Sequence, residues 1–333
     1  LRFRLFKLGF FKHMSKIPSI SGEIDEDKIF KIINKNFSKI APIYYELITG
    51  WLVRSYQSFN DIDKFIILIY FINKDLIFFR KNGLIVDYDT FYKDKTLEIP
   101  KINISDISND LKIPKESVRR KLHELEKTGV IKKTGKKIFL DRSAFITQKP
   151  EQTLKEFSAL INKFNELLVE EKLTTKIFDV NKISQSIKDN FSFCWYQFYK
   201  FLFIFTNRWR DIIIDLETLT IGFVVLLNTA GNKKFKVRDL NMKNWTKLSQ
   251  GADNVGVNAM SLSDIIGIPR PTVVRKVKYL VKKEWLHINE KKLITLNIKN
   301  KTLTSAAKNQ ELNMKDLSKF LLRVFNQIKV INS

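Results

Sequence analysis

The chain has 333 residues, and its 59 Lys and Arg against 35 Asp and Glu give a formal net charge of +24, which favours a polyanionic partner. Hydrophobic residues make up 44% of the chain, which excludes an intrinsically disordered protein. The single cysteine and three scattered histidines exclude a disulfide framework and a metal site with Cys or His ligand spacing.

Residues 1–24 are basic and aromatic, and they predict a flexible leader because they lack the long apolar run and cleavage site of a secretory signal. The two most apolar stretches, 191–205 and 212–228, contain charged residues and fall short of the ~18 uncharged residues that a membrane span needs. We therefore expect buried helices in a cytoplasmic protein that does not associate with a membrane.

Three segments recur later in the chain in the same order. DKIFKIINKNFS at 27–38 matches NKISQSIKDNFS 154 residues later (181 − 27), and DIDKFIILIYF at 61–71 matches DLETLTIGFVV at the same spacing (215 − 61). IPKESVRRKL at 113–122 then matches IPRPTVVRKV 155 residues later (268 − 113). The spacing predicts an internal duplication, with halves at 25–175 and 176–333.

Each half has the same predicted order of elements. A helical region with apolar periodicity is followed by a second apolar helix, and a long polar connection then leads to the basic segment. These connections span 81–103 and 231–258. Two short strand-like runs follow, and an amphipathic helix closes each half. The predicted fold is mostly α-helical with small β-wings, and the closing helices are expected to pack across a pseudo-two-fold axis.

The first basic segment predicts a short helix, a tight turn, a second helix and a hairpin. Ser105 is the predicted cap of the first helix, and Pro114 opens the second. Gly129 stands where a helix C-cap is expected, and the hairpin turns around Thr134 and Gly135. The apolar stripe predicted to be buried consists of Val118, Leu122 and Leu125.

The second basic segment follows the same pattern with a different cap. Its predicted hairpin turns at Asn289 and Glu290, and Glu284 stands opposite Gly129. Its predicted buried stripe consists of Val273, Val277 and Leu280. A helix, a turn, a basic helix and a basic hairpin are what a winged helix-turn-helix requires, since its second helix enters the major groove of DNA.

Both copies share the pattern I-P-x-x-[ST]-V-x-R-K followed by a hairpin, and they resemble the DNA-binding module of MarR-type and Crp-type transcription regulators. The resemblance implies winged helices at about 103–142 and 258–298. It also implies that one chain holds what is normally two subunits, as a monomeric pseudo-dimer or within a homodimer. The residues expected to contact double-stranded DNA are Lys115, Glu116, Ser117, Arg119, Arg120, Lys133, Lys136, Lys137, Arg270, Thr272, Arg275, Lys276, Lys291 and Lys292.

These residues favour a sequence-specific transcription regulator whose two recognition helices differ. Arginine reads guanine, a short hydroxyl binds phosphate, and wing lysines lie along the backbone. Two other functions stay open: a plasmid or phage replication initiator with paired winged helices, and a protein-interaction scaffold. No residue set indicates an enzyme or a cofactor, and the sequence does not decide whether a small-molecule effector binds.

Overall fold

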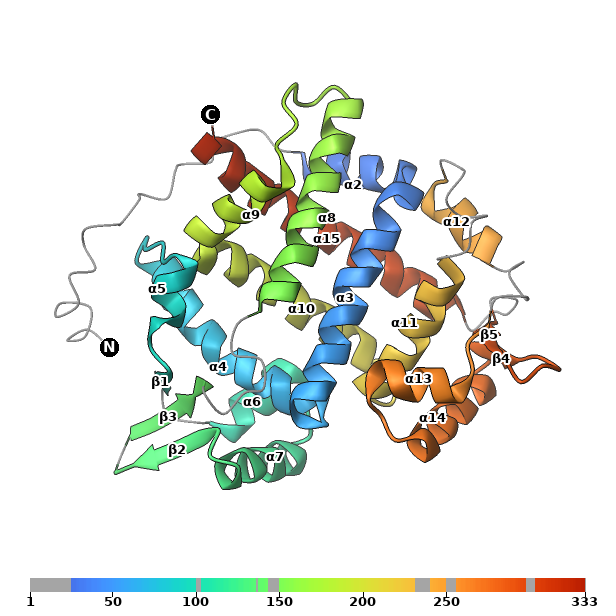
Figure 1. Ribbon diagram of the computed structural model, residues 1–333, viewed down its shortest axis with the longest axis horizontal. Helices are drawn as coiled ribbons and strands as arrows, with labels where there is room; N and C mark the ends of the chain where they lie inside the picture. The colour runs from blue at the N-terminus through green and yellow to red at the C-terminus, as the bar shows by residue number, and fades with distance from the viewer. Residues whose placement is uncertain are drawn as a thin grey trace.

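The computed structural model describes residues 25–99, 103–135, 137–142, 150–230, 240–249, 256–297 and 303–332, so the predicted leader at 1–24 lies outside the described part. The protein is mostly helical and carries two small antiparallel sheets (Figure 1). The helices are α2 (Glu26–Lys35), α3 (Phe37–Phe59), α4 (Ile62–Lys81), α5 (Tyr88–Lys93), α6 (Ile104–Leu111), α7 (Lys115–Lys127), α8 (Glu151–Glu170), α9 (Val180–Asp189), α10 (Phe191–Arg210), α11 (Leu216–Ala230), α12 (Met242–Ser249), α13 (Ala259–Ile266), α14 (Arg270–Lys282) and α15 (Leu303–Asn332). The strands are β1 (Thr96–Ile99), β2 (Ile131–Thr134), β3 (Lys137–Asp141), β4 (Leu286–Ile288) and β5 (Ile294–Leu296).

The long helices α3 and α10 form the centre of the molecule, and α4, α8, α11 and α15 pack around them (Figure 1). Apolar residues lie on almost every side of α10, which is the pattern of a helix buried among neighbours. Its rings pack with those of the adjacent helices: Phe157 of α8 lies between Phe198 of α10 and Phe320 of α15, with centroid distances of 5.4 and 5.1 Å. Aromatic burial therefore joins the two closing helices to the central one.

The helical region predicted at the start of each half is broken in the structure at an asparagine. Asn36 separates α2 from α3, and Asn190 separates α9 from α10. In each case the side-chain amide donates to the carbonyl four residues earlier, at 3.1 Å for Asn36 and 3.0 Å for Asn190. An amide that bonds the backbone in this way competes with the helix and ends it locally.

Contacts between the first and second halves of the chain are reciprocal. The Ser38 N–H donates to the Leu240 carbonyl and the Leu240 N–H to the Ser38 hydroxyl, both at 2.9 Å. The Ser192 N–H and the Val86 N–H make the matching pair of bonds, also at 2.9 Å. Ser38 and Ser192 end the first pair of recurring segments, and Val86 and Leu240 are separated by the same spacing. Each half therefore holds the other by the same contact.

Aromatic side chains repeat this reciprocal arrangement beside the serines. Phe37 of α3 meets Trp245 of α12 edge-on at 5.3 Å between ring centroids, and Phe191 of α10 meets Phe91 of α5 at 5.1 Å. Phe37 and Phe191 stand at matching positions of the recurring segments, and Phe91 and Trp245 have the same spacing. The segments just after α4 and α11 are thus packed against the opposite half.

An arginine on each central helix is held by the closing helix beside it. Arg54 donates to the Thr153 hydroxyl at 3.0 Å and pairs with Glu156 at 2.5 Å. Arg208 follows Arg54 at the spacing of the recurring segments, and it bonds Asn313 and pairs with Asp316 at 2.5 Å. These partly buried pairs fix α8 on α3 and α15 on α10.

The polar connections predicted at 81–103 and 231–258 contain regular structure, which corrects the expectation of long loops. The first holds α5 and then β1, whose four residues pair with β3 in the antiparallel order β1-β3-β2. Of the second, residues 240–249 and 256–258 are described, and they include α12. Val257 bridges Ile294 of β5, so the β4-β5 ribbon also receives a third segment, at one residue pair.

Candidate nucleic-acid interface

The first candidate module comprises α6, α7, β2 and β3. The N-cap of α6 is Asn103, whose side chain accepts from the Ser105 N–H at 3.0 Å, so the predicted capping role of Ser105 is wrong. Lys112 ends α6 in the left-handed region at φ 51°, and Pro114 precedes α7 with φ −54°. Pro114 fits there because its missing N–H would have no partner in the helix. The turn between the two helices is therefore short and fixed.

The buried side of α7 is the one that the sequence predicts. Val118, Leu122 and Leu125 are all buried, and they hold the helix against α6 and the hairpin. Gly129 follows the helix at φ 77°, and the Val130 N–H donates back to the Leu125 carbonyl at 3.0 Å. This is the glycine-ended C-terminus expected from the sequence, and it leads the chain directly into β2.

The second candidate module comprises α13, α14, β4 and β5, and it has the same turn. Gly267 ends α13 in the left-handed region at φ 85°, and Pro269 precedes α14 with φ −53°. Val273, Val277 and Leu280 are buried as predicted. Glu284, which stands opposite Gly129, also lies in the left-handed region, at φ 59°. The backbone path is therefore kept although the glycine is not.

Most of the predicted contact residues lie on the outer surface of these modules. Ser117 and Thr272 are half-buried, and Lys136 lies outside the described residues. The exposed members of the predicted set are Lys115, Glu116, Arg119, Arg120, Lys133, Lys137, Arg270, Arg275, Lys291 and Lys292. The structure also exposes Lys278 and Lys282 on α14, which the sequence-based set omitted although both follow Arg275 at helical spacing.

Lys276 has a different environment from the other predicted residues, because its side chain is only 13% exposed and turns inward. Its ammonium lies 2.6 Å from a carboxylate oxygen of Asp215, the residue that caps α11 by accepting from the Thr218 N–H. Burial favours a higher pKa for Asp215, but the hydrogen bonds from Lys276 and Thr218 outweigh it and lower that pKa. Lys276 therefore fixes α14 to the core.

The first module has the corresponding contact. The Lys121 ammonium bonds the carboxylate of Asp61, which caps α4 by accepting from the Lys64 N–H at 3.2 Å. Lys121 and Lys276 stand at matching positions of the two basic segments, and Asp61 and Asp215 each begin a copy of the second recurring segment. The matching Asp and Lys positions were visible in the sequence, but nothing there indicated that they pair.

Each module also touches the central helix of the opposite half. The Asn207 amide on α10 donates to the Asp110 carbonyl in α6 at 2.6 Å, and Lys112 pairs with Asp211 at 2.7 Å. On the other side, the Gln57 amide on α3 donates to the Ile265 carbonyl in α13 at 3.4 Å. The modules are therefore seated on a shared helical core.

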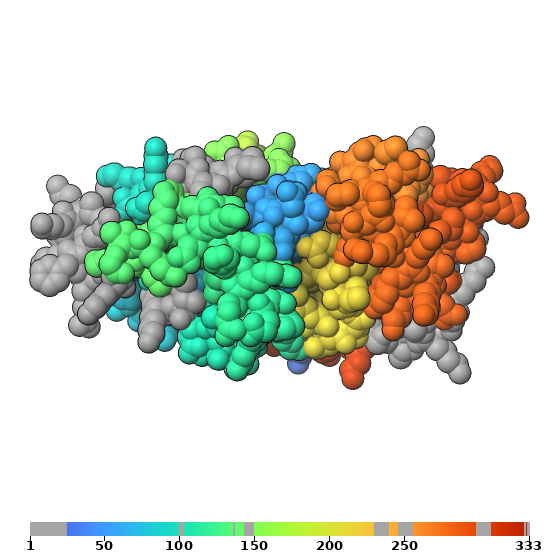
Figure 2. Space-filling view, turned by 90° about the horizontal axis from the view of Figure 1, so that it is seen from below, coloured from blue at the N-terminus to red at the C-terminus, as the bar shows by residue number. Residues whose placement is uncertain are grey.

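Both modules lie on one face of the molecule. Figure 2 shows α6 and α7 beside α13 and α14, with the end of α3 and the turn between α10 and α11 separating them. The β2-β3 hairpin and the β4-β5 ribbon lie toward opposite ends of the molecule (Figure 1). The two basic helices and their hairpins are therefore able to meet a single extended partner.

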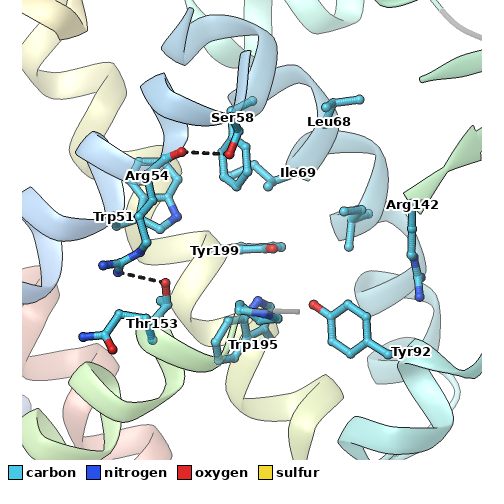
Figure 3. Close-up of a pocket in the computed structure, with 14 residues that line it drawn as sticks. Trp51, Arg54, Ser58, Leu68, Ile69, Tyr92, Arg142, Thr153, Trp195 and Tyr199 are labelled. Carbon is cyan, nitrogen blue, oxygen red and sulfur yellow. Dashed lines mark hydrogen bonds between the residues drawn. The ribbon is translucent and has the colours of Figure 1, made fainter. Parts of the chain in front are cut away.

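A cavity of ≈ 90 Å³ lies behind the first module, between α3, α4, α8 and α10 (Figure 3). Its apolar wall includes Trp51 and Trp195, and two arginines reach it. Arg54 is held by α8 as described above, and the Arg142 guanidinium donates to the Phe91 carbonyl and lies 4.5 Å from the centre of its ring. The cationic groups at this cavity are thus already engaged by the protein.

Over the described ranges, no group of three or more His, Cys, Asp and Glu residues is placed to hold a metal ion. No helix in that part of the chain combines the length and hydropathy needed to cross a membrane. Comparisons with models of protein families, with curated proteins and with solved structures find no match to this chain.

Proposed function

We propose that the protein binds double-stranded DNA through two winged helix-turn-helix modules and acts as a sequence-specific transcription regulator. The observation that carries this proposal is the placement of two exposed basic helices, α7 and α14, on the same face (Figure 2). Each follows a tight turn and precedes a basic hairpin, which is the arrangement that inserts a helix into the major groove. The net charge of +24 favours a polyanion in the same way.

We infer that the modules belong to two duplicated halves related by a pseudo-two-fold axis. The reciprocal contacts of Ser38 and Ser192, and the paired Lys121 and Lys276, recur at nearly constant spacing. Contacts in which residue i of one half meets residue j of the other, and the reverse, are the signature of two-fold association. A single chain would then read two half-sites as a homodimer does.

The base-reading residues in this proposal lie near the start of each recognition helix. Lys115, Glu116 and Arg120 occupy that position on α7, and Arg270 and Arg275 occupy it on α14. The half-buried hydroxyls of Ser117 and Thr272 are placed for phosphate, and the hairpin lysines for the backbone. Because the two sets differ, the preferred site is expected to be an imperfect palindrome, with half-sites about 34–36 Å apart.

Selection of binding sites from a random duplex library tests the proposal. The expected product is two unequal half-sites in inverted orientation, and affinity for it should fall steeply with salt. Arg120→Ala combined with Arg275→Ala should abolish the enrichment while leaving the circular dichroism spectrum unchanged. Sites in direct repeat would redirect the assignment to a replication initiator. Binding partners retained by the double variant, without any salt-sensitive DNA binding, would replace the proposal with a protein scaffold.

A further inference from the structure

Most cations on the first module are paired with carboxylates of that same module. On α7, Arg119 lies 2.5 Å from Glu116, and Arg120 lies 3.8 Å from Glu124. The hairpin lysines have acidic neighbours as well: Lys132 with Asp141 at 2.6 Å, Lys133 with Glu126 at 3.0 Å and Lys137 with Glu98 at 3.2 Å. The local field of this module is therefore partly neutralised before any ligand arrives.

The second module has the opposite character. Helices α7 and α14 each carry five Lys and Arg, but α7 also carries three Glu and α14 carries no acidic residue. Among the described residues, Lys276 is the cation of this module that forms an ion pair, and it points inward. The exposed cations that have no carboxylate within ion-pair distance in the described part include Arg270, Arg275, Lys278, Lys282, Lys291 and Lys292.

This difference has a direct consequence for binding a polyanion. Phosphates gain affinity from counterions released as they meet free cations. A phosphate that approaches Arg119 must compete with Glu116, and the carboxylate itself repels the backbone. Glu116 is nevertheless suited to a base edge, since a carboxylate accepts from the N4 amino group of cytosine. The first module is thus poorer in backbone affinity and richer in discriminating groups.

We propose that the second module supplies most of the phosphate-backbone affinity and that the first module supplies most of the sequence discrimination. This division of labour rests on the proposed DNA binding and adds to it an unequal role for the two half-sites. The chain then holds DNA of any sequence mainly through α14 and its ribbon, and it selects its site mainly through α7.

The salt dependence of non-specific binding tests the affinity half of the proposal. The probe is a fluorescein-labelled random-sequence duplex of about 30 base pairs, long enough for two half-sites one helical turn apart. Anisotropy gives Kd for the full chain between about 50 and 200 mM KCl. Arg270→Ala with Arg275→Ala should lower the slope of log K against log salt by about 1.8, at about 0.9 for each phosphate contact.

The matched control removes two arginines from the first module. Arg119→Ala with Arg120→Ala should lower the slope by less than about 1, because both side chains have acidic partners. An equal or larger loss from this control would overturn the unequal roles while leaving DNA binding intact. If the unaltered protein binds the duplex without salt dependence, the proposed function itself fails. Thermal unfolding of both variants confirms that they are folded.

The discrimination half is tested by selection with a Glu116→Ala variant. We expect altered base preference in one half-site only, and non-specific affinity equal to or above that of the unaltered protein because a repelling charge is gone. Arg270→Ala should instead weaken binding to every duplex by a similar factor. An unchanged selected site with Glu116→Ala, or a changed preference with Arg270→Ala alone, would contradict the assignment.

Discussion

The inward-facing Lys276 allows a sharp test, because a lysine on a recognition helix is expected to bind DNA and this one binds the core instead. The perturbation is Lys276→Met, which keeps the length and apolar character of the side chain but removes the ammonium. Lys121→Met is its counterpart in the first module. Both variants leave the capping aspartate without its ion-pair partner.

The size of the effect follows from the exposure of each pair. Removing one partner of a buried ion pair costs about 3–5 kcal/mol, whereas exposed pairs contribute about 0–1 kcal/mol. Lys276 and Asp215 are 13% and 36% exposed, so we expect Lys276→Met to lower the free energy of unfolding by about 2 kcal/mol. Lys121 and Asp61 are 8% and 22% exposed, and the loss there should be larger, about 3 kcal/mol.

Urea unfolding followed by circular dichroism measures these losses, and its pH dependence identifies their origin. The lowered pKa of Asp215 means that the pair stabilises the protein above the ordinary value of about 3.9 and that this contribution is lost as pH falls through the folded-state pKa. The difference between Lys276→Met and the unaltered protein should therefore be largest near neutral pH and shrink below about pH 4. The salt slope of DNA binding should not change. Unaltered stability together with a slope lowered by about 0.9 would refute the structural role and restore Lys276 to the interface.

Three further predictions concern stability and reactivity. Burial raises the pKa of Asp75 to about 6 despite the nearby charge of Arg142, so its ionisation destabilises the fold as pH rises from about 4 to 6; Asp75→Asn should raise the free energy of unfolding by up to about 3 kcal/mol at pH 7 and have no effect below pH 4. Gly129→Ala should cost about 1–2 kcal/mol at its φ of 77°, whereas Gly222→Ala, inside α11 with open space around the added carbon, should gain about 1 kcal/mol in the same urea titration. Burial raises the pKa of the Cys194 thiol, so labelling by an aromatic disulfide reagent should be slow in buffer and rapid in urea; fast labelling in buffer would show that α10 opens readily.

The sequence predicts the turns and the buried stripes of both modules well, because they depend on local features. A proline after a tight turn, an apolar residue every three or four positions and a residue able to adopt positive φ are all visible within about 25 residues. Gly129, Gly267 and the stripe of Val118, Leu122 and Leu125 therefore lie where the pattern indicated.

Features that depend on distant partners were not predicted. The helices α5 and α12 are short, and their stability comes from Phe91 and Trp245 packing on the opposite half, so the surrounding polar residues read as loops. Lys276 read as an exposed cation because its partner, Asp215, lies 61 residues earlier. The predicted cap at Ser105 was displaced by Asn103 two positions before it, an error within the uncertainty of any helix start.

The reciprocal contacts at Ser38 and Ser192 also determine how this chain is made. Ser38 waits for Leu240, 202 residues further along, before its backbone and hydroxyl are both bonded. At a synthesis rate of about 5–20 residues per second, the apolar face of α3 is left uncovered for roughly 10–40 s on the ribosome. We therefore expect the nascent first half to be held open by chaperones, and the last step of folding to be the closure of α12 and α15 onto helices that were made first.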